Sequence, residues 1–128
     1  MKALLPNTVI VAAALGVGLG GCGSGDGDTP PVADPESIQL GAEVYAESCA
    51  SCHGADLQGT DRGPSHLSIV YEPNHHTDAA FRNAIANGAT QHHWSFGNMP
   101  PINGLTGEEV EAVIAFVRAE QERRGFEQ

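Results

Sequence analysis

Apolar residues along much of this chain recur at spacings of three and four, which is the period of an α-helix. The clearest stripe lies near the C-terminus and comprises Val110, Val113, Ile114 and Val117. Thr106 and Glu109 precede this stripe in the arrangement of a capping box, in which the two side chains satisfy free backbone donors of the first turn. The sequence therefore predicts a helix that begins just after Thr106 and ends in a turn rich in arginine, which suits the helix dipole.

Two further helices are predicted on the N-terminal side. Asp34 and Pro35 are the acidic cap and first-turn proline that begin many helices, and helical spacing then continues up to a pair of cysteines. Thr77 can cap a middle helix, which Gly88 ends with a left-handed cap. The apolar spacing in these two segments is carried by Ile38, Gly41, Tyr45, Phe81, Ala84 and Ile85.

Irregular segments separate the predicted helices. Residues 54–74 and 89–105 contain much Gly, Pro, Asp, Ser and Asn and little periodicity, and loops of this length in a small domain usually wrap something. No alternating run is long enough to predict a strand. We therefore expect an all-α domain with about three to four helices and long irregular loops.

Residues 1–21 have the pattern of an export signal. Lys2 gives a positive start, and the uncharged apolar run that follows is too short to cross a bilayer comfortably. Cys22 comes after two glycines in an arrangement that resembles a bacterial lipobox, where the signal is removed and the cysteine carries a lipid. An uncleaved anchor and a simple signal peptide with an incidental cysteine remain alternatives, and all three place the domain outside the cytoplasm.

Residues 22–34 are predicted to be a lipidated, flexible tether, because they contain Gly, Ser, Asp and Pro without apolar periodicity. Acyl chains on Cys22 would hold the protein at a membrane surface. The sequence therefore predicts a membrane-anchored lipoprotein of the periplasm or cell surface, with its folded domain over residues 35–125.

The length of 128 residues allows one modest domain. The formal net charge of -10 argues against a nucleic-acid-binding protein, which needs a basic surface for phosphates. Only 5% of the residues are aromatic, so a core built from side chains alone would be thin. We expect a bound group to contribute to burial.

Cys49, Cys52 and His53 form a C-x-x-C-H sequence, which is the attachment signature of c-type haem. Two intervening residues let both sulfurs reach the vinyl groups on one edge of a porphyrin, and the adjacent histidine can supply an axial ligand. A thioredoxin-like redox pair is an alternative, but the flanking segments lack the βαβ pattern. A zinc site is a further alternative. No second close pair of cysteines exists, but the six histidines leave open a mixed site of cysteine and histidine ligands.

With this motif, the chain resembles the single-haem c-type cytochromes of mitochondria and bacteria over residues 35–124. Gly41 and Tyr45 stand where that family has a small residue and an aromatic residue on its N-terminal helix, and Val113 and Phe116 stand where its C-terminal helix meets them. The resemblance implies a cytochrome c fold wrapped around one covalent haem c with its iron. Glycine at the crossing would let the two helix backbones approach closely.

Met99 lies in a segment that resembles the methionine loop of this family. The resemblance implies that Met99 is the second axial ligand of the iron, with His53 as the first. A thioether is a soft ligand that stabilises ferrous iron and raises the reduction potential. A methionine followed by two prolines in an irregular loop is also a poor place for a core-filling residue.

Other residues are candidate supports for the haem. Gly63 and Pro64 resemble the family's Gly-Pro pair, whose proline carbonyl accepts the Nδ1 hydrogen of the haem histidine and so orients the ring. The leucine that follows this pair in the family comes one residue late here, at Leu67. Trp94 and Arg62 are candidates to bind the haem propionates, with packing and surface roles as the alternatives.

The remaining histidines have no assigned role; they are His66, His75, His76, His92 and His93. Histidines in loops are mostly solvated surface residues. The alternatives are hydrogen bonds to propionates, competition for the iron by His92 or His93, and adventitious metal binding.

Two occupied axial positions would leave no open site on the iron for oxygen, peroxide or a substrate. We therefore expect a one-electron carrier of an extracytoplasmic respiratory chain and not an enzyme. Because the chain is acidic, we expect redox partner proteins with a basic docking patch, and a monomer that binds no nucleic acid. A small haem peroxidase or ligand sensor remains an alternative, as does a fixed electron-transfer subunit of a larger oxidoreductase complex.

Overall fold

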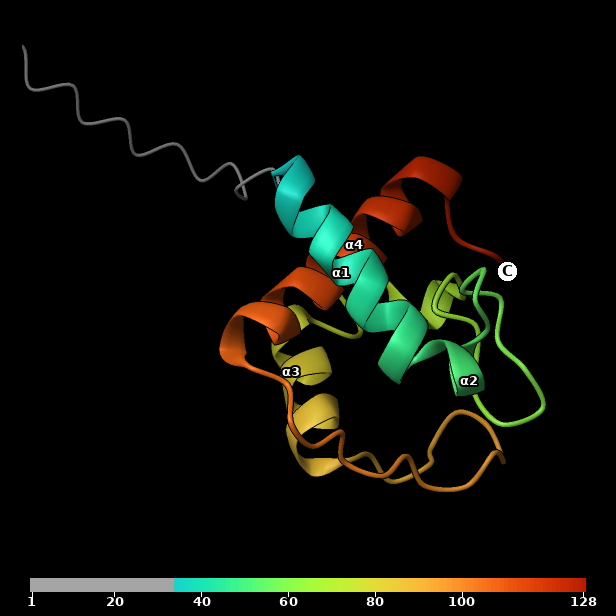
Figure 1. The fold of residues 1–128 in the computed structure, drawn as a ribbon. Helices are drawn as coiled ribbons and strands as arrows, with labels where there is room; N and C mark the ends of the chain where they lie inside the picture. Colours follow the sequence, from blue (N-terminus) through green and yellow to red (C-terminus); the bar gives the residue numbers. More distant parts are fainter. Residues whose placement is uncertain (1–33) are drawn as a thin grey trace, which may run out of the picture. The chain divides into compact units, whose positions relative to one another are not determined.

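The computed structural model describes residues 34–128. The predicted signal peptide over 1–21, the predicted lipid on Cys22 and the tether up to residue 33 lie outside the described residues. The elements are α1 (Pro35–Ser48), α2 (Ala50–His53), the 3-10 helix η1 (Ile69–Tyr71), α3 (Asp78–Asn87) and α4 (Gly107–Arg124) (Figure 1). Among the described residues there are four α-helices and only isolated β-bridges, so the predicted all-α fold class is confirmed.

The three longer helices begin at the predicted caps. Asp34 and Thr77 each accept a hydrogen bond from a backbone N–H in the first turn of the helix that follows. At the start of α4, Glu109 donates its backbone N–H to Thr106 Oγ1 at 3.2 Å, and the Thr106 N–H donates to the Glu109 carboxylate at 2.7 Å. Gly88, with φ of 76°, ends α3 in the left-handed region that favours glycine.

Helices α1 and α4 cross and pack against each other (Figure 1). Gly41 lies at the crossing, where a methyl group in place of its hydrogen would stand 2.0 Å from the carbonyl oxygen of Ala112. Beside this contact the Tyr45 and Phe116 rings pack with centroids 5.5 Å apart. The predicted close approach of the two backbones at Gly41 is therefore confirmed.

The buried core is small and lies mainly between α1, α4 and two loop leucines; it comprises Val44, Tyr45, Leu57, Leu67, Ile85, Ala112, Val113, Ile114 and Val117. The loop between α2 and α3 is tied to the C-terminal residues, because Ile69 N donates to Glu127 O and Glu127 N donates to Leu67 O. No helix within residues 34–128 combines the length and apolarity needed to cross a membrane.

Arg118 of α4 fastens the segment that leads into α3. Its guanidinium donates to the carbonyl oxygens of Tyr71 and His76 and forms an ion pair with Asp78, at 2.7 Å from Nε to the carboxylate. The same guanidinium lies 4.8 Å from the centre of the Phe81 ring, which is a cation–π distance. This irregular segment is therefore held by side-chain bonds from α4.

Candidate functional site

A cavity of about 440 Å³ opens beside the C-x-x-C-H segment. Its size is within the usual range for cofactor and ligand sites. Apolar side chains from α1, α3 and α4 form much of its wall; they include Tyr45, Phe81, Ile85, Val113 and Val117. The four sulfur and imidazole groups predicted to hold the haem all line it; they are Cys49, Cys52, His53 and Met99.

The short helix α2 arranges the two cysteines. Cys49 ends α1 and caps α2, and the backbone N–H groups of Cys52 and His53 both donate to the Cys49 carbonyl at 3.0 Å. Residues three apart on a helical turn lie on the same face. The two half-buried thiols therefore line the cavity together, and His53 follows directly.

The environment of Cys49 does not suit a reactive thiolate. Burial, with a smaller contribution from neighbouring Cys52, raises the pKa of the Cys49 thiol to about 11. Redox-active thiol pairs instead depend on a lowered thiol pKa. Among the described residues, the group of side chains close enough to share a metal ion contains neither cysteine. The raised pKa of Cys49 thus argues against a redox pair, and the composition of that group argues against a zinc site at the cysteines.

His53 is oriented by a backbone carbonyl. Its Nδ1 lies 2.9 Å from the carbonyl oxygen of Pro64, which can only accept, so Nδ1 carries the hydrogen and Nε2 keeps its lone pair. Burial lowers the pKa of His53, against a smaller opposing effect of the Pro64 hydrogen bond. Gly63 allows the loop to approach, since a side chain there would come within 2.9 Å of the Cys52 carbonyl oxygen.

His66 lies against the His53 ring, a contact that the sequence pattern does not predict. The two imidazoles are stacked with centroids 4.1 Å apart and planes 15° apart, and His66 is buried. Burial, then His53 and Arg118, lower the pKa of His66 well below its usual value, so the ring is neutral at pH 7. Its place two residues after Pro64 is the one sequence signal that could have indicated this packing.

The backbone of Met99 is held against the end of α3. Met99 and Ala89 exchange two backbone hydrogen bonds of 2.9 and 3.0 Å. Gly88 makes this possible, because a side chain there would come within 2.5 Å of the Met99 carbonyl oxygen. A further bond, from Ile102 N to Ile85 O, ties the following residues to α3. Met99 is thus placed in the cavity wall by its loop and not by the hydrophobic core.

The two candidate propionate-binding residues differ in position. Trp94 lines the cavity and stacks on Tyr71, with ring centroids 5.9 Å apart and planes 17° apart. Arg62 donates to the carbonyl oxygen of Ser51, and it is not among the side chains that line the cavity. The structure therefore brings Trp94, and not Arg62, to the site.

The residues around the cavity fit a covalently attached haem. Two thiols on one helical turn suit thioether links to the vinyl groups of a haem, and a neutral imidazole with a free Nε2 and a thioether are donors that suit its iron. The apolar walls suit a porphyrin face. The small protein core is consistent with a bound group that supplies additional burial.

Comparison with known proteins gives several relatives. The chain is 31% identical over 86 residues to "Cbb3-type cytochrome c oxidase subunit CcoP" of Rubrivivax gelatinosus, covering 66% of this chain and 26% of that protein. It is 36% identical over 75 residues to "Cytochrome c-551" of Bacillus subtilis (strain 168), covering 59% of this chain and 55% of that protein. The chain thus spans from about a quarter to about half of these two relatives.

A solved structure also matches. Cytochrome CL from Methylophaga aminisulfidivorans superimposes with a TM-score of 0.50 at 26% identity, over 69% of this chain and 55% of that one. The family model described as Cytochrome c matches residues 38–120, which include the C-x-x-C-H segment, the cavity and Met99. The chain therefore belongs to the cytochrome c family and binds haem c covalently.

Proposed function

We propose that this protein is a one-electron carrier of an extracytoplasmic respiratory chain, with Cys49, Cys52, His53 and Met99 holding its haem c. The observation that carries the proposal is the hydrogen bond from His53 Nδ1 to Pro64 O beside a cavity that both thiols and Met99 also line. When bound, the haem supplies a reversible one-electron change of its iron.

Each residue has a distinct part in this proposal. The two cysteines form the thioether links, and the neutral His53 offers Nε2 to the iron while its Nδ1–H bond to Pro64 O prevents the ring from turning. His66 packs on the same ring and limits its tilt. Met99 would offer its thioether to the iron as well, which would close the iron to small molecules and make electron transfer, not catalysis, the function.

A second candidate function has support from two relatives. The chain matches segments of a cytochrome c oxidase subunit and of the "Quinohemoprotein alcohol dehydrogenase" of Comamonas testosteroni, in which the match covers 11% of that protein. A fixed electron-transfer subunit of a larger oxidoreductase would use the same cavity. Gel filtration of a mild detergent extract from the native membrane separates the two proposals, since a carrier elutes as a small species and a subunit elutes with its complex.

The proposed location rests on the sequence before residue 34. We propose that Cys22 carries a lipid that anchors the mature protein outside the cytoplasm. A protein that starts at Pro31 behind a generic cleavable export signal should leave the membrane fraction with its haem, whereas Ser24→Ala in the full chain should stay there. Retention of the Pro31 protein in membranes that have been washed with salt would contradict a lipid on Cys22 as the anchor.

Met99→Leu tests the function most directly, because leucine preserves the volume of the side chain but removes the sulfur. The wild-type protein should be low-spin in both oxidation states and should bind carbon monoxide poorly. The variant should keep its covalent haem, become partly high-spin when ferric, bind carbon monoxide readily and have a lower potential. Optical spectra and a redox titration measure all four properties.

Ile102→Leu is the matched control, since Ile102 lines the same cavity without an atom that could ligate iron. It should leave spin state and potential close to those of the wild type. If the wild-type protein is already high-spin and binds carbon monoxide at once, Met99 is not at the iron and a peroxidase or ligand sensor becomes the better interpretation.

A further inference from the structure

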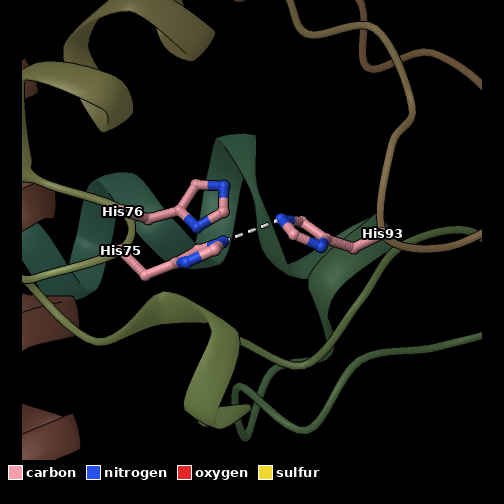
Figure 2. A group of neighbouring side chains, drawn as sticks. All are labelled: His75, His76 and His93. Carbon is pink, nitrogen blue, oxygen red and sulfur yellow. Dashed lines mark hydrogen bonds between the residues drawn. The ribbon is translucent and has the colours of Figure 1, made fainter.

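Four histidines from two loops meet at one side of the cavity; they are His75, His76, His92 and His93. The first two lie just before α3 and the other two follow it. Figure 2 shows the rings of His75 and His93 reaching toward each other, with His76 beside them. The Nε2 atoms of His75 and His93 are 3.2 Å apart, and those of His76 and His92 are 3.4 Å apart.

Backbone carbonyls determine which nitrogen of two of these rings carries hydrogen. His76 Nδ1 lies 2.7 Å from the Val70 carbonyl oxygen, and His92 Nδ1 lies 2.8 Å from the Thr90 carbonyl oxygen. A carbonyl can only accept, so each Nδ1 donates and each neutral ring has its lone pair on Nε2. Two Nε2 lone pairs thus face each other at 3.4 Å, an arrangement that repels unless a cation lies between them.

The spacing of these nitrogens matches that of ligands in a tetrahedral metal site. Imidazole nitrogens bind zinc at about 2.0–2.1 Å in a tetrahedral arrangement, which places any two of them about 3.3 Å apart. The two observed separations of 3.2 and 3.4 Å bracket that value. The candidate ligand atoms of His75, His76 and His93 all lie within 4.8 Å of one another. We propose that His75, His76 and His93 form a binding site for one divalent transition-metal ion of the zinc type, separate from the haem iron, with His92 as a neighbour of His76.

The backbone around the cluster is held by bonds that do not use the proposed ligand atoms. Arg118 donates to the His76 carbonyl oxygen, and the Glu72 carbonyl accepts from the backbone N–H groups of His75 and His76. On the other loop, Gln91 N donates to Asn98 Oδ1 at 3.1 Å. A hydrogen bond from the second ring nitrogen, such as the one from His76 Nδ1 to the Val70 carbonyl oxygen, typically orients a metal-binding histidine.

The charge state of the cluster also suits a cation. Burial lowers the pKa of His76, with His75, His92 and Arg118 adding to this against the opposing Val70 hydrogen bond. The pKa of His93 is lowered, first by slight burial and to a smaller extent by the three neighbouring imidazoles. Neutral imidazole is the form that binds metal, and the net charge of -10 attracts cations to the protein.

Zinc binding to the purified haem protein tests the proposal. After dialysis against micromolar Zn²⁺ at pH 7.5 and passage over a desalting column, elemental analysis should find one zinc per haem iron. Zinc K-edge absorption should show only nitrogen or oxygen neighbours, at about 2.0–2.1 Å. Because a dication near the haem favours the ferrous state, zinc should also raise the midpoint potential.

The double variant His75→Ala/His93→Ala removes two exposed side chains, so it should fold and keep its haem spectrum. Its zinc affinity, measured by competition with a chelating dye, should fall by about 100-fold or more, since loss of even an outer-shell partner costs about 10–100-fold. The control Asn74→Ala/Ser95→Ala changes exposed neighbours in the same two loops and should bind zinc like the wild type.

Three results would overturn the site. One is less than stoichiometric zinc in the wild type, and another is equal zinc affinity in the double variant and its control. The third is a change of the haem spectrum in the double variant without added zinc, which would place one of these histidines at the iron. The first two results would leave the covalent haem and the Met99→Leu test unaffected. The third would also contradict Met99 as a ligand, and Met99→Leu would then leave the haem spectrum unchanged, so failure of this site and failure of the proposed ligand set are distinguishable.

Discussion

At the residue scale, the chemistry of His53 depends on a neighbour that contributes no side-chain functional group. The Pro64 carbonyl fixes the hydrogen on Nδ1 and leaves Nε2 for a metal. A proline is well suited to this, because its constrained backbone holds the carbonyl in one direction. The stacked His66 then resists tilting of the ring, so two loop residues determine the position of one imidazole.

The two cysteines are predicted to act independently, each forming one thioether. Cys49→Ala/Cys52→Ala should therefore leave no haem stain on a denaturing gel, whereas either single variant should keep a weaker stain. Ser51→Ala, between the two, should stain like the wild type. The double variant should also unfold more easily, because it loses the apolar surface that the haem buries in the folded domain. A haem stain that survives the double change would contradict attachment at this motif.

The candidate site could be predicted in two ways. The C-x-x-C-H segment is local in sequence, so its geometry follows from one helical turn, whereas Met99 is indicated by the resemblance of its loop to the methionine loop of a known family. The contact between His66 and His53 and the meeting of the four loop histidines could not be predicted. Both depend on how long irregular segments fold back, which no short-range periodicity encodes.

At the scale of the helices, Gly41 is the position where α1 and α4 leave no room for a side chain. Gly41→Ala would place a methyl group against the Ala112 carbonyl oxygen and force the helices apart, since neither backbone can yield locally. We expect a loss of about 3 kcal/mol in the free energy of unfolding, the upper part of the usual range for overpacking. Denaturant unfolding of the haem protein, monitored by circular dichroism, measures it.

Gly107→Ala is the matched control for that change, because nothing lies within 4 Å of where its methyl group would stand at the start of α4. It should be neutral or stabilise the protein by about 0.4–1 kcal/mol, through the lower entropy of the unfolded chain. Equal effects of the two substitutions would show that the close crossing does not limit stability.

The N-terminus of α4 should make stability depend on pH in acid. Hydrogen bonds from the Thr106 backbone and side chain lower the pKa of the Glu109 carboxyl below its usual 4.5. A carboxyl whose pKa is lower in the folded state adds stability that is fully present above about pH 4.5 and disappears as the pH falls through the folded-state value. The wild type should therefore be more stable than Glu109→Gln at pH 7, and the difference should vanish in acid.

Glu108→Gln serves as the control for the capping interaction, because Glu108 is also in the first turn of α4 but outside the capping box. The stability difference between the wild type and Glu108→Gln should change less between pH 7 and pH 3 than the difference between the wild type and Glu109→Gln. A constant difference between the wild type and Glu109→Gln over this range would show that the charge of Glu109 contributes nothing to the cap.

The helices themselves were largely predictable, and the paths of the loops between them were not. Caps at Asp34, Thr77 and Thr106 are short-range signals, and the structure confirms each helix start. The link between the loop near Leu67 and the C-terminal Glu127 joins residues about sixty apart. Its backbone hydrogen bonds carry no side-chain signature, so sequence spacing gives no indication of them.

On the scale of the whole molecule, the negative charge is poorly compensated. Four of the five arginines in the described part are paired with acidic side chains, through Arg82–Glu111, Arg118–Asp78 and the contacts of Arg123 and Arg124 with Glu120. The sequence nevertheless contains 16 acidic residues against six basic ones. The surface therefore has an excess of carboxylates, which favours a positively charged redox partner.

This excess charge should control how electron-transfer rates respond to salt. Interactions between exposed charges are screened over about 30 Å at 0.01 M ionic strength but only about 3 Å at 1 M. Oxidation of the ferrous protein by a cationic cobalt(III) complex should therefore slow as salt is added, and oxidation by anionic ferricyanide should speed up, with each oxidant serving as the control for the other. Stopped-flow measurement of both second-order rate constants tests this, and opposite trends would show that the haem edge lies in a locally basic surface, so that its partner must be acidic.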